Sequence, residues 1–140
     1  MNDLLRKIGP WIDQAIYAGI TVYALFHWQW SAHYLVGISL TFVGFTLWTI
    51  AKLQLGASFA VWAQAKRLVT TGLYSKIRHP IYFFGGIAIL GLFVAWGRLV
   101  PLVLFLAFYT TQLLRMKKEE AVLEQAFGDE YRRYKASTWF

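Results

Sequence analysis

Long apolar runs alternate with short polar connections along this chain, and the runs predict its helices. Four runs are long enough for membrane-crossing helices, at residues 8–26, 34–51, 81–96 and 99–114. The last two are about 16 residues each, shorter than the roughly 20 that a helix needs to cross the hydrocarbon core, and only Gly97 and Arg98 separate them. We expect an all-α integral membrane protein with about four transmembrane helices and a cytoplasmic C-terminal helical tail. The last two runs either cross the membrane with help from flanking residues or together form a tight helical hairpin. A buried soluble bundle is the alternative.

The composition favours the membrane. Hydrophobic residues make up 58% of the 140 positions and charged residues only 15%, whereas soluble domains average about 25% charged residues. There is no cysteine, so disulfide bonds and thiolate metal sites are excluded, and the three histidines lack the spacing of metal ligands. The N-terminal segment has no small-residue cleavage site, so we do not interpret it as a cleaved signal peptide.

The basic residues predict an orientation. With four crossings, all of the 14 Lys and Arg residues except Arg98 fall on one side of the membrane, and the positive-inside rule then places both termini in the cytoplasm. The net charge of +7 does not indicate nucleic-acid binding, because the basic residues flank apolar runs and form no separate basic domain. We therefore expect a multi-pass membrane protein without a nucleic-acid partner.

A first polar cluster lies at residues 68–82, between the second and third apolar runs. Pro80 disfavours helical backbone at His79, so the third helix should begin at about Pro80 or Ile81. His79 and Tyr82 then lie at a helix N-terminus, where free backbone N–H groups suit a carboxylate. A single histidine near an interface is often only a structural hydrogen-bonding group, but the neighbouring Arg78 favours a functional role.

A second polar cluster, Arg115 with Glu119 and Glu120, follows the fourth run. If the helix continues past the membrane surface, Gln112, Arg115 and Glu119 share one face. The paired carboxylates could accept the hydroxyls of a ribose or bind a cation, or the Arg115–Glu119 pair could be an ordinary surface ion pair. Both clusters are expected on the cytoplasmic side, which favours one shared site.

The C-terminal tail follows a predicted helix end at Phe127 and Gly128, because glycine readily leaves the helical conformation. Beyond it Tyr131 and Tyr134 are three residues apart and share a helix face. The tail either folds back over the shared site as a lid or lies on anionic headgroups through its basic residues.

The clusters and their order resemble the membrane methyltransferase family that contains isoprenylcysteine carboxyl methyltransferases and phospholipid N-methyltransferases. The first motif is Leu68-Val69-x-x-Gly72-x-Tyr74-x-x-x-Arg78-His79-Pro80-x-Tyr82. The second is Arg115-x-x-x-Glu119-Glu120-x-x-Leu123-x-x-x-Phe127-Gly128-x-Glu130-Tyr131-x-x-Tyr134. The resemblance implies one membrane domain, with N-terminal spans over residues 1–65 and a cofactor-binding core over residues 66–140.

The resemblance also implies S-adenosylmethionine as the methyl donor and a lipid or lipidated acceptor that enters from the bilayer. That acceptor would be an isoprenylcysteine-like carboxylate or a phospholipid amine. Arg115 and His79 are the implied catalytic residues: Arg115 would orient a carboxylate, whereas an amine would need His79 or Glu119 as a base. The implied cofactor contacts are Lys66, Leu68, Val69, Tyr74, His79, Pro80, Ile81, Tyr82, Glu119 and Glu120.

Two other functions fit parts of the pattern. Sterol reductases, which use a reduced nicotinamide cofactor, have a similar hydrophobic hairpin and tyrosine-rich tail, although they usually carry Arg-Asp where this chain has Glu119-Glu120. A small four-span transporter is the non-enzymatic alternative, because Asp13 in the first run could couple ion movement to transport. The transporter hypothesis leaves the Arg-His-Pro cluster unexplained.

Overall fold

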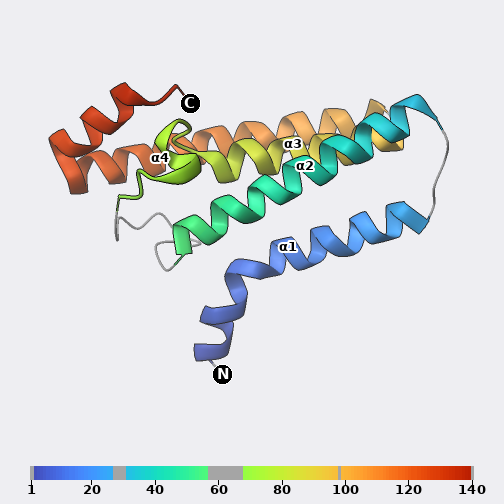
Figure 1. Cartoon of the computed structure of the whole chain (residues 1–140), viewed down its shortest axis with the longest axis horizontal. Helices are drawn as coiled ribbons and strands as arrows, with labels where there is room; N and C mark the ends of the chain where they lie inside the picture. The colour runs from blue at the N-terminus through green and yellow to red at the C-terminus, as the bar shows by residue number, and fades with distance from the viewer. Residues whose placement is uncertain (1, 27–30, 57–67, 98, 140) are drawn as a thin grey trace.

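The structure is a computed structural model that describes residues 2–26, 31–56, 68–97 and 99–139, and these residues form helices and their connections (Figure 1). In chain order the elements are α1 (Asn2–Phe26), α2 (Ala32–Leu55), the short 3₁₀ helix η2 (Gly72–Ser75), α3 (Pro80–Trp96) and α4 (Leu99–Ser137). Helices α2, α3 and α4 lie side by side, and α1 lies along the other side of α2. The predicted all-helical architecture is confirmed.

The α2–α3 pair is the most closely packed part of the fold, because small residues let the two backbones approach. A Cβ atom added at Gly44 of α2 would lie 2.6 Å from the backbone nitrogen of Ala88 in α3. One added at Gly91 of α3 would lie 2.5 Å from the backbone nitrogen of Thr41. Small residues at such positions are typical of helices that pack within membranes.

Helix α1 is fastened to this pair by polar contacts. The Tyr17 hydroxyl donates a hydrogen bond to the carbonyl oxygen of Ala88 in α3. Gln14 Nε2 donates to Thr49 Oγ1 of α2 at 3.3 Å. The Tyr17 ring also packs in the buried core beside Trp48. These contacts position the polar face of α1 toward the interior of the bundle.

Two helix boundaries agree with the sequence predictions. Helix α3 begins at Pro80, and His79 precedes it in non-helical backbone with φ −123° and ψ 57°. Helix α4 changes direction at Gly128, whose φ of 49° and ψ of −120° form a conformation that favours glycine. The predicted fourth apolar run is therefore the first part of a long helix that continues through the second cluster to Gly128, where the tail turns back (Figure 1).

Helix α2 is longer than the second apolar run predicts. It continues to Leu55 and ends before Gly56, which has a positive φ of 51°. The charged Lys52 does not end the helix, because its ammonium group has a partner in α1 and need not reach water. The boundary predicted at Ala51, before the charged Lys52, was therefore wrong.

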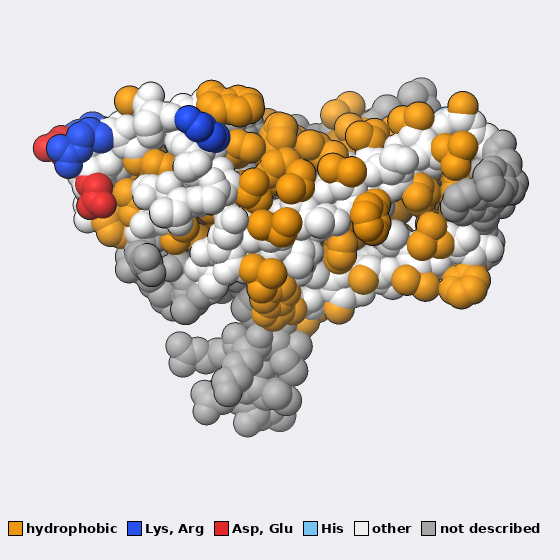
Figure 2. All heavy atoms as spheres, viewed as in Figure 1, with side chains coloured by type: hydrophobic (Ala, Val, Ile, Leu, Met, Phe, Trp, Pro, Cys, Tyr) orange, Lys and Arg blue, Asp and Glu red, His pale blue; other side chains and the backbone are white. Residues whose placement is uncertain are grey.

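The helices differ in whether their length and hydropathy suit a membrane span. Among the described residues, α2 is the helix with the length and hydropathy of a membrane span, and α3 is apolar but has only 17 residues. Figure 2 shows hydrophobic side chains over most of the visible face, while Lys, Arg, Asp and Glu side chains gather at the end that carries the α4 tail. The count of four crossings and the cytoplasmic orientation stay predictions.

Candidate functional site

The fold brings the two polar clusters together through Arg78, which follows η2. Its Nε atom lies 3.1 Å from Glu120 Oε1 on α4. Its Nη1 atom donates to the carbonyl oxygens of Lys135 and Thr138, both at 3.3 Å. Arg78 thereby connects the first cluster to the second and to the tail, as the prediction of one shared site requires.

The tail packs against the first cluster. The Tyr134 hydroxyl donates to the carbonyl oxygen of Tyr74 at 2.7 Å, and the backbone nitrogen of Trp139 donates to the carbonyl oxygen of Lys76 at 3.2 Å. Tyr131 is fully buried, and the centre of its ring lies 6.2 Å from the centre of the Tyr134 ring. Of the two predicted positions of the tail, the structure has the one in which it folds back.

Glu120 is the centre of a half-buried charge network. His79 Nε2 lies 3.1 Å from its Oε1 atom, and Lys135 Nζ lies 2.6 Å from its Oε2 atom. Although burial alone would raise the pKa of Glu120, hydrogen bonds from Lys135, His79 and Arg78 lower that pKa to about 2. Burial lowers the pKa of His79, and Glu120 only partly opposes this effect. Both carboxylate oxygens of Glu120 therefore bind protein groups that join the two clusters.

Glu119, the next residue along α4, has a different environment. Its Oε1 atom accepts a hydrogen bond from the Tyr82 hydroxyl at 2.5 Å and lies 3.1 Å from Arg115 Nε. Its Oε2 atom accepts no hydrogen bond from any residue that the structure describes. The side chain is 22% exposed. Glu119 is thus held in one orientation with an oxygen available to a ligand.

The other predicted cofactor residues that the structure describes lie before η2, within it or at the start of α3. Pro80 is fully buried at the start of α3, and Tyr74 is buried beneath the tail. Leu68 and Val69 are half-buried in the segment before η2. Lys66 lies outside the described residues.

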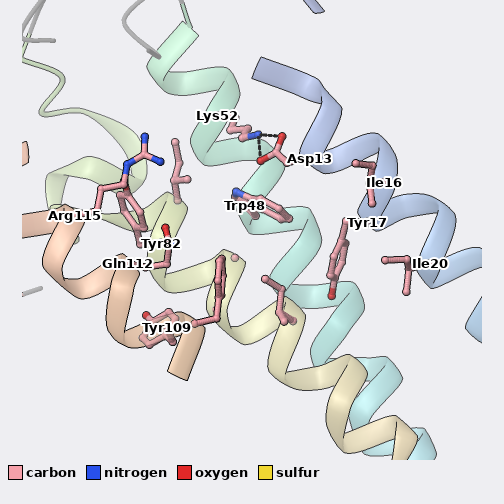
Figure 3. Close-up of a pocket in the computed structure, with 15 residues that line it drawn as sticks. Asp13, Ile16, Tyr17, Ile20, Trp48, Lys52, Tyr82, Tyr109, Gln112 and Arg115 are labelled. Carbon is pink, nitrogen blue, oxygen red and sulfur yellow. Dashed lines mark hydrogen bonds and ion pairs between the residues drawn. The ribbon is translucent and has the colours of Figure 1, made fainter. Parts of the chain in front are cut away.

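A pocket of about 390 Å³ lies between the four helices (Figure 3), and two of its lining residues, Tyr82 and Arg115, contact Glu119. Isoleucine side chains and aromatic rings form most of its wall. The residues that give it polar character are Asp13, Lys52, Tyr82, Gln112 and Arg115. A mostly apolar cavity of this size with a few polar groups is typical of a small-molecule site.

The pocket receives only part of the predicted site. Ile81, Tyr82 and Arg115 line it, and Tyr82 and Arg115 both contact Glu119. The Arg115 guanidinium lies 6.0 Å from the centre of the Tyr82 ring. His79 does not line the pocket and instead contacts Glu120. The catalytic role of His79 stays a prediction, and its place behind the pocket wall gives that role no direct support.

Sequence reasoning missed the ion pair that forms another part of the pocket. Lys52 Nζ of α2 lies 2.6 Å and 2.7 Å from the two carboxylate oxygens of Asp13 in α1. The ammonium group also lies 5.1 Å and 5.9 Å from the ring centres of Trp48 and Trp11. The sequence signals only an acid within an apolar run, and nothing in it indicates a partner 39 residues away.

Comparison with known proteins identifies the family of the chain. Residues 16–130 match the family model of the phospholipid methyltransferases. The chain belongs to the phospholipid methyltransferase family. It is also similar to the protein-S-isoprenylcysteine O-methyltransferase of Schizosaccharomyces pombe, with 37% identity over 91 residues, which cover 61% of this chain and 39% of the relative. The chain thus matches well under half of that relative's length.

Membership of the phospholipid methyltransferase family confirms the family, the methyltransferase class and S-adenosylmethionine as the methyl donor that such enzymes use. The first motif and most of the second lie within the matched residues 16–130. The match also includes residues 16–26 of α1, which sequence reasoning had left unassigned beyond its membrane character.

Proposed function

We propose that this protein transfers a methyl group from S-adenosylmethionine to the carboxylate of a lipophilic acceptor at the cytoplasmic face of a membrane. One observation carries the proposal. Glu119, with an oxygen available to a ligand, contacts Tyr82 and Arg115, and these two residues also line the pocket. A donor bound at Glu119 and an acceptor bound in the pocket would therefore meet at these side chains.

The groups around Glu119 fit S-adenosylmethionine. Glu119 Oε2 can accept hydrogen bonds from ribose hydroxyls. Helix α3 has no side-chain cap at its N-terminus, and the Phe83 N–H is already bonded to the carbonyl oxygen of His79. The preceding N–H groups of Ile81 and Tyr82 therefore suit the carboxylate of the donor's amino-acid part. When bound, S-adenosylmethionine supplies a methyl group that is already activated by its positively charged sulfur.

Arg115 provides the acceptor's charged contact. Its side chain is 42% exposed, and it lines the pocket beside Glu119. A guanidinium binds and orients a carboxylate through charge-assisted hydrogen bonds. The acceptor oxygen then forms a bond to the methyl carbon as the carbon–sulfur bond breaks, and the electron pair of that bond stays on sulfur. Correct alignment of the two reactants supplies much of the rate enhancement.

The apolar walls of the pocket fit the rest of a lipophilic acceptor. Ile16 and Ile20 of α1 and Phe108 of α4 line it and are also exposed on the surface of the molecule. A hydrocarbon chain along these side chains would remain in contact with the bilayer while the charged end lies at Arg115. Entry from the side would spare the acceptor a passage through water.

An amine acceptor is less compatible with this pocket. An ammonium group must lose a proton before it can accept a methyl group, and Arg115 repels a cation. His79, one of the two predicted bases, lies beside Glu120 and does not line the pocket. The geometry therefore favours a carboxylate over a phospholipid amine.

Calorimetric titration of the purified protein in detergent with S-adenosylmethionine tests the donor site. Glu119→Gln should lose saturable binding, because Gln cannot supply the charge that Tyr82 and Arg115 orient. Glu124→Gln is the matched control: this glutamate lies on the same helix in an exposed pair with Arg132, and its variant should bind like the wild type. Equal affinity in both variants would contradict the assignment.

A further inference from the structure

The end of the tail lies beside the segment that leads into α3. The backbone nitrogen of Trp139 donates a hydrogen bond to the carbonyl oxygen of Lys76 at 3.2 Å. Lys76 lies four residues before Pro80, the first residue of the apolar helix α3. The predicted entry of α3 into the membrane at this point would place Trp139 at the boundary between the headgroups and the hydrocarbon core.

Trp139 differs in exposure from the other aromatic residues of the tail. Tyr131 and Tyr134 are only 0% and 8% exposed, whereas Trp139 is 74% exposed. A single exposed hydrophobic residue needs no explanation on a soluble protein. At the edge of a bilayer, however, tryptophan has a preferred environment, because its ring is apolar and its N–H group can bond to headgroups or water. The ring is therefore in the position of an interfacial anchor.

The charges around the end of the tail do not balance. Glu120 is the acid that Arg78 and Lys135 both contact. Lys76 is exposed and has no ion pair with any residue that the structure describes. Figure 2 shows Lys and Arg side chains at this end of the molecule, beside the hydrophobic side chains of the bundle. The excess of basic groups over the single carboxylate attracts anionic headgroups.

We propose that Trp139 and Lys76 bind the headgroup region of a bilayer that contains anionic phospholipids, and that this contact holds the tail in its folded-back position. The Trp139 ring lies among the headgroups, and the Lys76 ammonium group contacts lipid phosphates. Glu120 fastens the tail from its inner side, and the bilayer fastens it from its outer side. The cover that the tail forms over Tyr74 then depends on the charge of the surrounding membrane.

A second copy of the chain is the competing occupant of this surface. The exposed Trp139 ring would then pack against another protomer and not against lipid. The charge favours the bilayer, because a symmetric contact brings the same patch of each copy together and would oppose two basic surfaces. The two occupants also differ in what controls the tail: headgroup charge in one case, and the number of protein copies in the other.

The test follows hydrogen exchange of the tail peptide at residues 131–139 in nanodiscs that each hold a single copy of the full chain. One set of discs contains phosphatidylcholine alone, and the other also contains phosphatidylglycerol. Wild-type tail amides should exchange about fivefold more slowly in the anionic discs, the effect of one basic side chain near an anionic surface. In Lys76→Gln this ratio of exchange rates should fall to near one.

Two further variants separate this contact from other effects. Lys118→Gln is the matched control: it removes an exposed basic side chain of α4 that lies before the tail, so the fivefold ratio should persist. Trp139→Ala keeps the backbone hydrogen bond to Lys76 but removes the ring, so its tail should exchange severalfold faster than the wild type in both kinds of disc. Because all three side chains are exposed, the variants should melt like the wild type.

Three outcomes would overturn the inference. Equal wild-type exchange in both kinds of disc would mean that headgroup charge does not hold the tail. An equal fall of the ratio in Lys76→Gln and Lys118→Gln would mean that only the overall charge matters. Tail exchange that changes with the number of copies per disc, and not with the lipid, would assign the surface to a second copy. The readout involves neither S-adenosylmethionine nor an acceptor, so it is independent of the proposed function.

Discussion

The charge network around Glu120 makes the most detailed prediction, because it joins the tail to both polar clusters. Glu120→Gln keeps the shape of the side chain but removes the charge that Arg78, His79 and Lys135 all contact. We expect the tail to open more often as a result, while the rest of the helical bundle remains folded.

The magnitude follows from the charged hydrogen bonds that this substitution weakens. Hydrogen bonds to charged groups contribute roughly 1.5–3 kcal/mol each. Gln still bonds to some of the partners, and Glu120 is 19% exposed, so water compensates in part. A net loss of about 2 kcal/mol corresponds to roughly a 30-fold increase in tail opening.

Hydrogen exchange followed by mass spectrometry on the tail peptide at residues 131–139 measures this opening. Its amides should exchange roughly 30-fold faster in Glu120→Gln, in line with the loss of about 2 kcal/mol. Glu124→Gln is again the matched control, because its partner Arg132 lies 3.5 Å away in an exposed pair that contributes at most about 1 kcal/mol. The same exchange rate in both variants would refute the reasoning that Glu120 fastens the tail.

Three other predictions concern pH, helix packing and the donor site. Because burial lowers the pKa of His79, the folded protein disfavours its protonation, and the stability this gives is complete above the ordinary His pKa of about 6.5 and falls below it. Since His79 contacts Glu120, which also binds the tail residue Lys135, tail exchange corrected for its intrinsic rate should rise from pH 7 to pH 5. A His79→Gln variant with the same rise would contradict this. Gly44→Ala should lower the free energy of unfolding in detergent by about 1–3 kcal/mol, because its Cβ would lie 2.6 Å from the backbone of α3. Gly19→Ala, whose Cβ would meet open space, should not destabilise the protein, and similar melting temperatures for the two variants would contradict the packing. Tyr82→Phe removes the hydroxyl that orients Glu119 and should weaken S-adenosylmethionine binding by about tenfold in calorimetry, whereas unchanged affinity would exclude that role.

Local backbone rules predicted several features of the fold correctly. Pro80 sets the start of α3, and Gly128 sets the break in α4. Both residues act through the conformations that their own backbones allow, so no knowledge of tertiary contacts is needed. The Arg115–Glu119 contact was similarly accessible, because residues four apart on a helix are neighbours.

The different contacts of Glu119 and Glu120 could not be predicted in this way. Helical geometry indicates that the two side chains point in different directions, but not which one meets Arg78 and Lys135. That depends on the path of the tail after Gly128, which is a tertiary property. Sequence reasoning therefore assigned both glutamates to the cofactor.

The contribution of α1 to the pocket was also beyond the sequence pattern. Asp13 lies within the first apolar run and Lys52 directly follows the second, and each alone resembles an isolated polar residue near a membrane. Their pairing arises because α1 and α2 are adjacent in the fold, with both Trp11 and Trp48 beside the ammonium group. Periodicity within one helix carries no information on such contacts.

The chemical form of the transferred methyl group tests the central claim most directly. The protein is incubated with labelled S-adenosylmethionine and N-acetyl-S-farnesyl-L-cysteine in vesicles that also contain phosphatidylethanolamine, and the product is treated with alkali. Methyl esters release the label as methanol, whereas methylated amines retain it. A carboxyl methyltransferase gives alkali-labile label that disappears in Arg115→Ala. Alkali-stable label in the phospholipid, or no labelled product with either acceptor, would contradict the account.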